Sequence, residues 1–229
     1  MKALLPLKHP AAYLLALVAA VLPAAAWLGA AETGSDQKDT AAWPRFRGPG
    51  GDGISSEQNW SADWPNNGPE EVWTRGIGTG YSTVSVANGR VYTMGNEKST
   101  DYVWCLSEKD GSVIWKQSYP CKNFQYPGPR ATPTVADGAV YTLSARGDVA
   151  CFDAAKGTPR WSKRLAKELG AKAPKWGFSG SPLVDGELVI YNVGSAGTAL
   201  NRKTGEIVWE SGNDVSGYST PVVFEMGSK

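Results

Sequence analysis

The sequence is poor in the residues that many enzymes use for proton transfer and metal binding. Of its 229 residues, only one is a histidine, His9, and three are cysteines. Ser-His-Asp and Cys-His arrangements therefore cannot be assembled from the chain beyond its first residues, and histidine-containing zinc sites are excluded there too. The three cysteines also lack the Cys-x-x-Cys spacing that is typical of a metal-binding loop.

The sequence also lacks an excess of charge of either sign. Its 23 Lys and Arg residues and 22 Asp and Glu residues give a net charge of +1. Nothing in this balance indicates binding to a nucleic acid or to an anionic membrane surface. Glycine and proline are abundant instead, with 27 and 15 residues, as expected of a turn-rich β protein.

A repeat dominates the rest of the chain. Residues 82–115, 131–161 and 181–209 share one template, and a fourth copy starts at Tyr218. The template has a start rich in Ser, Thr, Pro and Val, an Asn-Gly or Asp-Gly pair, two apolar runs and a final Trp. Its period of about 40–50 residues is that of a four-stranded propeller blade. The sequence therefore predicts an all-β, incomplete β-propeller with three whole blades and partial flanking ones.

Within residues 131–161, the pattern predicts strands at 134–136, 139–143, 149–152 and 159–162, with a hairpin turn at Asp137-Gly138. Residues 163–172 are rich in strong helix formers and predict one short helix.

Each repeat ends with a tryptophan that follows a glycine turn. We expect the tryptophan to lie on the outer strand and to bury its ring between neighbouring blades. Glycine is expected at the turn because it adopts a positive φ without strain. These structural docking residues are Trp73, Trp115, Trp161, Trp209, Gly111, Gly157 and Gly205.

The repeats resemble the PQQ-like (pyrroloquinoline-quinone-type) β-propeller family over residues 72–224. Cys151-Phe152-Asp153, Gly157 and Trp161 match the family's docking motif, and residues 43–53 resemble a lead found before such propellers. The family includes quinoprotein alcohol dehydrogenases and the assembly factor BamB. The resemblance implies that residues 71–74 are the orphan outer strand of a blade completed elsewhere. We therefore expect a fragment of a longer protein and an under-packed Trp73.

The N-terminal residues have the pattern of an export signal. A basic start, an Ala-rich apolar run and small residues predict a signal peptide over residues 1–31, cleaved near Ala31. The alternative is an uncleaved anchor over residues 11–31, which would be the only membrane attachment. Residues 32–42 are expected to form a disordered linker, residues 43–70 a lead, and residues 71–229 the partial propeller. The expected location is the periplasm or cell envelope.

The cysteines leave two alternatives open. Cys105 and Cys151 share a repeat position with Ala199 and are expected to be buried free thiols. Cys121 falls between two blades and is expected to be more exposed. A bridge between Cys105 and Cys121 is an alternative that the sequence leaves open.

Four loops precede the first strands of the blades, at residues 80–83, 128–133, 177–182 and 217–221. We call them the approach loops. In a propeller they would ring one mouth of the central channel and could hold a ligand. The alternative is that their small hydroxyl residues only pack around the axis. The candidate binding residues are Tyr81, Ser82, Arg130, Thr132, Phe178, Ser179, Tyr218 and Ser219.

The favoured function is a non-catalytic binding or scaffold propeller with a protein or small-ligand partner at the mouth, and with no catalytic residue and no cofactor. The rival that the resemblance implies is a PQQ- and calcium-dependent dehydrogenase of alcohols or sugars. In that family a Trp and a disulfide between adjacent cysteines enclose the quinone, a carboxylate and an Asn hold calcium, and an Asp acts as base. The sequence has no Cys-Cys pair, which favours the binding protein.

Overall fold

The computed structural model describes residues 42–58, 60–122, 126–224 and 227. All of them belong to Lys38–Lys229, the second of two compact units into which the chain divides. The expected signal peptide, and the expected linker except for its last residue, lie outside the described residues. No helix in the described ranges is both long and apolar enough to cross a bilayer.

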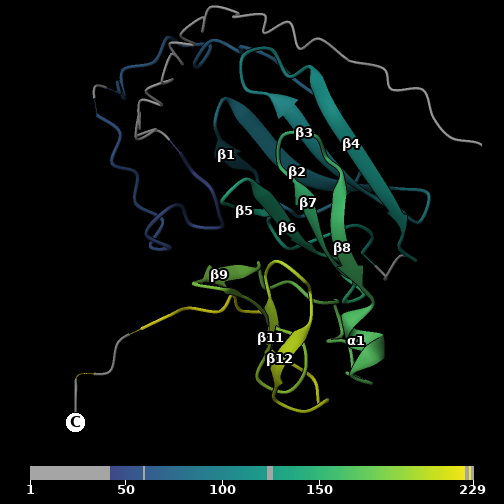
Figure 1. The fold of residues 1–229 in the computed structure, drawn as a ribbon. Helices are drawn as coiled ribbons and strands as arrows, with labels where there is room; N and C mark the ends of the chain where they lie inside the picture. Colours follow the sequence, from purple (N-terminus) through teal and green to yellow (C-terminus); the bar gives the residue numbers. More distant parts are fainter. Residues whose placement is uncertain (1–41, 59, 123–125, 225–226, 228–229) are drawn as a thin grey trace, which may run out of the picture. The chain divides into compact units, whose positions relative to one another are not determined.

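The described chain forms three four-stranded antiparallel sheets, which we call blades 1, 2 and 3 (Figure 1). The strands of each blade lie in chain order from one edge of the sheet to the other. The predicted all-β fold class is therefore confirmed. Blade 1 contains β1 (Ser85–Ala87), β2 (Arg90–Glu97), β3 (Thr100–Ser107) and β4 (Val113–Pro120); blade 2 contains β5 (Thr134–Ala136), β6 (Ala139–Leu143), β7 (Val149–Asp153) and β8 (Pro159–Lys163); blade 3 contains β9 (Leu183–Asp185), β10 (Leu188–Tyr191), β11 (Thr198–Asn201) and β12 (Ile207–Glu210).

Local sequence explains blade 2 closely. Its four strands lie within one residue of their predicted bounds. Asp137 and Gly138 both have positive φ, 46° and 68°, which is the conformation that a two-residue hairpin turn requires. The helix predicted after the blade is a single turn, α1 (Leu165–Glu168).

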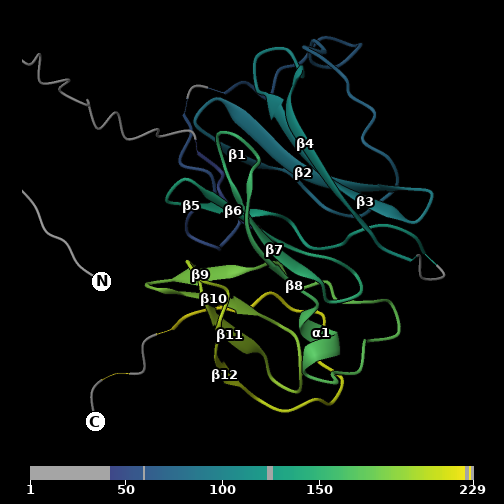
Figure 2. The same ribbon diagram turned by 45° about the vertical axis from the view of Figure 1, so that its right-hand side comes forward.

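The first strands of the three blades are neighbours. β5 contacts both β1 and β9, and Figures 1 and 2 show these strands on the same side of their sheets. In a propeller this is the side of the central channel. We call the free edge of each first strand, opposite its second strand, the channel edge.

Blade 2 buries both of its faces. Side chains alternate between the two faces of a strand, so that Val140 on β6 joins a core cluster with Met94 and Trp115 of blade 1. Leu143 lies three residues further along β6, and its side chain therefore points to the opposite face. There it joins a second core cluster with Val189 of blade 3. The continuous apolar runs of the central strands follow from this two-sided burial.

A tryptophan on each of two outer strands packs against the glycine turn of the next blade. Trp115 on β4 lies over Gly157, and Trp161 on β8 lies over Gly205. Each indole Nε1 donates a hydrogen bond of 2.9 Å to a backbone carbonyl of the same turn. A Cβ on either glycine would lie less than 3 Å from the ring, so these turns require glycine.

The tryptophans at the two ends of the repeat differ. Trp73 lies over Gly111 and donates to the Glu108 carbonyl at 2.8 Å, although residues 71–74 form no strand. The expectation that Trp73 is under-packed is therefore wrong, because docking requires the next turn and not a complete sheet behind the ring. Trp209 on β12 is 41% exposed, and no glycine turn of this type packs against it among the described residues.

The lead begins on the channel edge. Trp43 and Val86 of β1 exchange backbone hydrogen bonds of 2.8 and 2.9 Å, which form an isolated antiparallel bridge. The backbone N–H of Val135 on β5 then donates to the Pro44 carbonyl at 2.8 Å. The lead thus passes from blade 1 to blade 2 before the tight turns of residues 45–53.

Candidate functional site

Four hydroxyl residues of the approach loops link neighbouring blades. Thr83 and Thr132 share a hydrogen bond of 2.7 Å between their hydroxyl groups. The Thr132 N–H donates to Ser181 Oγ, and the Ser181 N–H donates to Thr220 Oγ1, both at 2.9 Å. Thr132 and Ser181 are buried, and this row of hydrogen bonds ties the blades together.

An open cavity of about 750 Å³ lies beside this row of hydroxyl groups, and we call it the mouth cavity. Four segments that are far apart in the sequence contribute to it: the lead, the approach loop at residues 128–133, the approach loop at 177–182 with β9 after it, and the approach loop at 217–221 with the two residues after it. The lining residues are Arg45, Phe46, Arg47, Gly50, Gly51, Arg130, Ser179, Ser181, Pro182, Leu183, Val184, Asp185, Tyr218, Ser219, Thr220, Pro221, Val222 and Val223.

Positive charge dominates the mouth cavity. Its ionisable lining consists of Arg45, Arg47, Arg130 and one carboxylate, Asp185. Backbone carbonyls hold the guanidinium groups: Arg45 donates to the Gly48 carbonyl at 3.2 Å, and Arg47 and Arg130 make similar bonds within their own loops. A carbonyl fixes a guanidinium without neutralising its charge, so Arg45 and Arg47 keep the cavity electropositive.

The backbone of Arg47 is unusual. Its φ of 63° lies in the left-handed region that residues other than glycine rarely adopt. Such strain is often found at binding sites, where the surrounding structure holds it in place. Here the turn is fixed by the Gly53 N–H, which donates to the Arg47 carbonyl at 2.9 Å.

Four of the residues proposed from the sequence line the mouth cavity: Arg130, Ser179, Tyr218 and Ser219. Tyr218 also packs beside the ring of Trp176, with ring centroids 5.6 Å apart. These side chains come from three different approach loops and are partly or largely exposed.

Two other proposed residues lie outside the lining of this cavity. The Tyr81 ring is 5.4 Å from the Arg130 guanidinium, in a cation–π arrangement that steadies the arginine. Ser82 is half-buried, and its hydroxyl donates to the Thr83 carbonyl at 3.0 Å.

Two proposed residues prove to be structural. Phe178 is fully buried, in the core cluster that contains Leu143 and Leu165. Its ring also lies where a Cβ on Gly147 would be. Thr132 belongs to the row of hydroxyl groups between the blades. Both predictions are corrected here, because the period of the repeat does not show that the approach loop turns Phe178 inward.

Sequence reasoning missed the arginines of the lead. Arg45, Phe46 and Arg47 reach the mouth because the bridge between Trp43 and Val86 places the lead on the channel edge. The sequence signal that could have indicated them is the presence of two arginines, Arg45 and Arg47, in a segment otherwise rich in glycine and proline.

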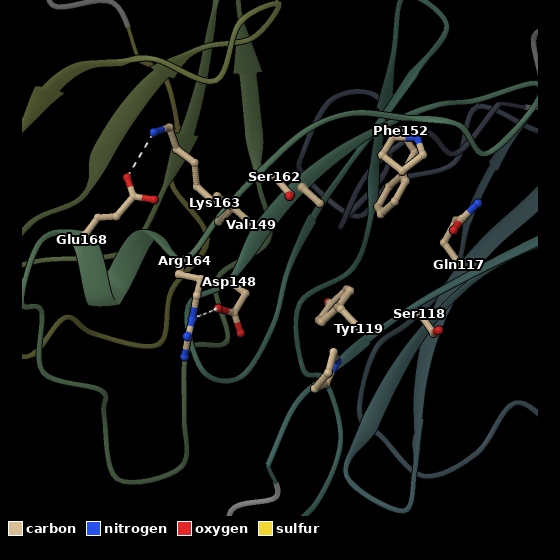
Figure 3. A pocket seen from close by; sticks show the side chains of 13 residues that line it. Gln117, Ser118, Tyr119, Asp148, Val149, Phe152, Ser162, Lys163, Arg164 and Glu168 are labelled. Atoms are coloured by element: carbon tan, nitrogen blue, oxygen red, sulfur yellow. Dashed lines mark hydrogen bonds and ion pairs between the residues drawn. The ribbon is translucent and has the colours of Figure 1, made fainter.

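A second cavity, of about 600 Å³, lies between β4 of blade 1 and β7 and β8 of blade 2 (Figure 3). Asp148 pairs with Arg164 at 3.7 Å, and Lys163 pairs with Glu168 at 3.1 Å. Figure 3 shows these pairs on one side and Tyr119 on the other. Since its charges are paired, this cavity has no net charge that would attract an ion.

A polar row is buried behind Tyr119. Asn96, Asp101 and Tyr119 are cross-strand neighbours on β2, β3 and β4, so they share one face of blade 1. Asn96 Nδ2 donates to Asp101 Oδ1 at 2.7 Å. Asp101 Oδ2, the Tyr119 hydroxyl and the Thr142 hydroxyl of blade 2 make no hydrogen bond of normal geometry among the described residues. Burial raises the pKa of Asp101, although the bond from Asn96 acts in the opposite direction.

All three cysteines are buried free thiols. This agrees with the expectation for Cys105 and Cys151, whereas the expected exposure of Cys121 is wrong. The Cys121 N–H donates to the Ser99 carbonyl at 2.8 Å and so draws the chain back onto blade 1. Burial raises the pKa of Cys121 to about 12 and that of Cys151 to about 11. Both are therefore protonated and weakly reactive at neutral pH.

Residues 123–224 match the family model described as outer membrane protein assembly factor BamB. The chain is also similar to tetrathionate hydrolase of Acidithiobacillus ferrooxidans, with 26% identity over 155 residues, covering 61% of this chain and 30% of that protein. The chain thus spans less than a third of this relative's length.

Solved structures with similar folds include BamB from Moraxella catarrhalis, at 17% identity and a TM-score of 0.41 over 61% of this chain and 54% of that one. Another is a europium-containing methanol dehydrogenase, at 19% identity and a TM-score of 0.44 over 57% of this chain and 24% of that one. A third is the quinohemoprotein alcohol dehydrogenase of Comamonas testosteroni, at 25% identity and a TM-score of 0.45 over 59% of this chain and 21% of that one.

Three observations agree on the family: the repeated four-stranded sheets, the tryptophans that pack on glycine turns between them, and the match over residues 123–224. The repeats over residues 123–224 therefore resemble those of the BamB-like, PQQ-like β-propeller family.

Proposed function

We propose that the chain is a non-catalytic binding module of the cell envelope, and that the mouth cavity holds its partner. The observation that supports this is the convergence of four distant segments on one cavity, which carries three guanidinium groups and one carboxylate. An open cavity of this size with a few fixed polar groups is the usual form of a binding site. The matching family is named for an outer membrane assembly factor, which is consistent with a role in the envelope.

A photo-crosslinker tests the location of the partner. p-Benzoylphenylalanine would replace Ser179 or Tyr218 at the mouth and, as a control, Val113, which is 39% exposed on an outer strand. We expect adducts in cells from the two mouth positions and not from Val113. Adding Arg47→Glu should reduce those adducts at least ~5-fold, because it reverses one charge of the cavity. Equal adducts from Val113 and from the mouth would contradict the proposal.

Export is a separate part of the proposal, since residues 1–31 lie outside the described residues. Expression of the whole chain in a bacterium with an outer membrane, followed by N-terminal mass spectrometry, tests it. The expected product is periplasmic and begins near Glu32. An intact N-terminus in the membrane fraction would support the uncleaved anchor, and a cytoplasmic product would contradict export.

The alternative of a PQQ- and calcium-dependent dehydrogenase does not fit the described residues. Its quinone site would use a disulfide between adjacent cysteines, whereas Cys105, Cys121 and Cys151 are separate buried thiols. Calcium is held by six to eight oxygen ligands, but arginines dominate the mouth cavity. The described ranges contain no group of three or more His, Cys, Asp or Glu residues arranged for a metal. We therefore assign no catalytic step to these residues.

A further inference from the structure

The lead shows how the channel edges of the first strands can be used. In blades 1 and 2, a two-residue turn joins the first strand to the second, and the last residue of the first strand pairs with the first residue of the second. The residue just before this last residue is Val86 in blade 1 and Val135 in blade 2. In an antiparallel ladder, hydrogen-bonded and non-bonded pairs alternate, so the backbone groups of these valines point away from the second strand. Trp43 and Pro44 of the lead bond to them there.

Blade 3 has the same geometry at its channel edge. Asp185 and Leu188 close the turn between β9 and β10, and Val184 is paired with Val189. The N–H and C=O of Val184 therefore point toward the channel side, as those of Val86 and Val135 do. Within the described ranges, no backbone hydrogen bond is made on this edge of β9.

The charge beside this edge selects the kind of segment that would bind there. Val184 lines the mouth cavity together with Arg45, Arg47 and Arg130. An extended peptide paired with Val184 would place an adjacent side chain in this electropositive space, where a carboxylate suits a guanidinium.

We propose that an extended peptide segment with an acidic side chain adds to β9 through the backbone of Val184, as the lead adds to β1 and β5. This inference rests on the proposed function and names the chemistry of its partner. A polyanionic sugar would use the arginines but would not need the backbone of Val184, so the two kinds of ligand can be separated by experiment.

The probe is the peptide acetyl-Thr-Val-Glu-Val-Thr-amide, titrated into the ¹⁵N-labelled chain and followed by NMR. We expect the backbone amide of Val184 to shift with saturation, together with the Nε signals of Arg45 and Arg47. The same peptide with Gln in place of Glu should bind at least ~5-fold more weakly. An unshifted Val184 amide at saturation, or equal affinity for the Gln peptide, would overturn the proposal.

Two substitutions at one position provide the decisive comparison. Val184→Pro removes the outward N–H without breaking the ladder to β10, and proline is tolerated at the edge of a sheet. Val184→Ala keeps the N–H and serves as the matched control. By fluorescence anisotropy of the labelled Glu peptide, we expect Val184→Pro to weaken binding about fivefold or more, and Val184→Ala less than about twofold.

Circular dichroism would establish that both variants are folded. Equal binding by Val184→Pro and the native chain would overturn the inference. A heparin hexasaccharide that binds both variants equally, while the peptide binds neither, would also overturn it but would leave a binding module at the mouth intact. Failure of the mouth crosslinks, by contrast, would remove the proposed function itself.

Discussion

Among single residues, the Asp101 carboxyl group is fully buried between blades 1 and 2, and burial raises its pKa. The folded state therefore holds the proton more tightly than the unfolded state does. The stability that results is complete below the unfolded pKa and is lost as the pH rises through the folded pKa. Asp101→Asn keeps a neutral group at every pH. We expect it to raise the free energy of unfolding by about 1–3 kcal/mol at neutral pH, with a smaller gain in acid, measured by urea titration.

Asp110 serves as a control for Asp101, because its pKa is shifted in the opposite direction. The Ser112 hydroxyl and N–H donate to Asp110 Oδ1 at 2.7 and 3.0 Å and lower the pKa of Asp110 to about 2. Its contribution to stability is present above the unfolded pKa and is lost as the pH falls through the folded pKa. Asp110→Asn should therefore be less stable than the native chain at neutral pH, and the difference should vanish in acid. If both variants responded to pH in the same direction, the assignment for Asp101 would be wrong.

The docking tryptophans give a second comparison between residues. Trp161 packs on Gly205 of the next blade and donates a hydrogen bond to the Arg202 carbonyl of the same turn, whereas Trp209 is 41% exposed. Trp161→Ala should lower the free energy of unfolding by about 3–5 kcal/mol, and Trp209→Ala by less than ~1 kcal/mol. Guanidinium titrations measure both values. Equal losses would show that Trp209 is covered in solution.

At the scale of the elements, the lead is held on β1 by one bridge to Trp43. Val86→Pro removes the N–H that donates to Trp43 but leaves the ladder to β2 intact, because that N–H points to the channel edge. We expect trypsin to cleave after Arg45 and Arg47 at least ~5-fold faster in this variant, since backbone freed from its partners opens more readily. Mass spectrometry of the digest locates the cuts.

Val184→Pro is the matched control for this experiment, because it removes the equivalent N–H from β9, where no described residue of the lead makes a backbone hydrogen bond. Cleavage after Arg45 and Arg47 should stay at the native rate. If both proline variants were cut equally fast, the lead would be held by something other than its bridge to β1.

The elements show how far sequence reasoning reaches. Blade 2 was predictable because each of its strands ends at a local signal, such as the turn of Asp137 and Gly138. The position of the lead was not predictable, since the bridge between Trp43 and Val86 joins segments 43 residues apart without any local pattern. For the same reason, the repeat located Arg130 and Ser179 at the mouth but could not bring Arg45 to it.

At the scale of the whole described structure, blade 2 has neighbours on both faces, and the outer strand of blade 3 has the least cover. All five residues of β6 are buried, whereas all four of β12 are exposed. Amide exchange follows the free energy of local opening, which is lowest where few apolar contacts are made. We therefore expect the amides of β6 and β7 to exchange at least ~10-fold more slowly than those of β11 and β12 in hydrogen-exchange mass spectrometry.

The contacts between blades add a directional test to this measurement. Trp161 links blade 2 to blade 3, and Trp115 links blade 1 to blade 2. Trp161→Ala should speed exchange in β9–β12 more than in β1–β4, because in a repeat protein each unit is stabilised mainly by its neighbours. Trp115→Ala should show the reverse order. If each substitution sped exchange equally in all three blades, the sheets would unfold as one cooperative unit, and the tryptophans would stabilise the whole rather than the junctions they occupy.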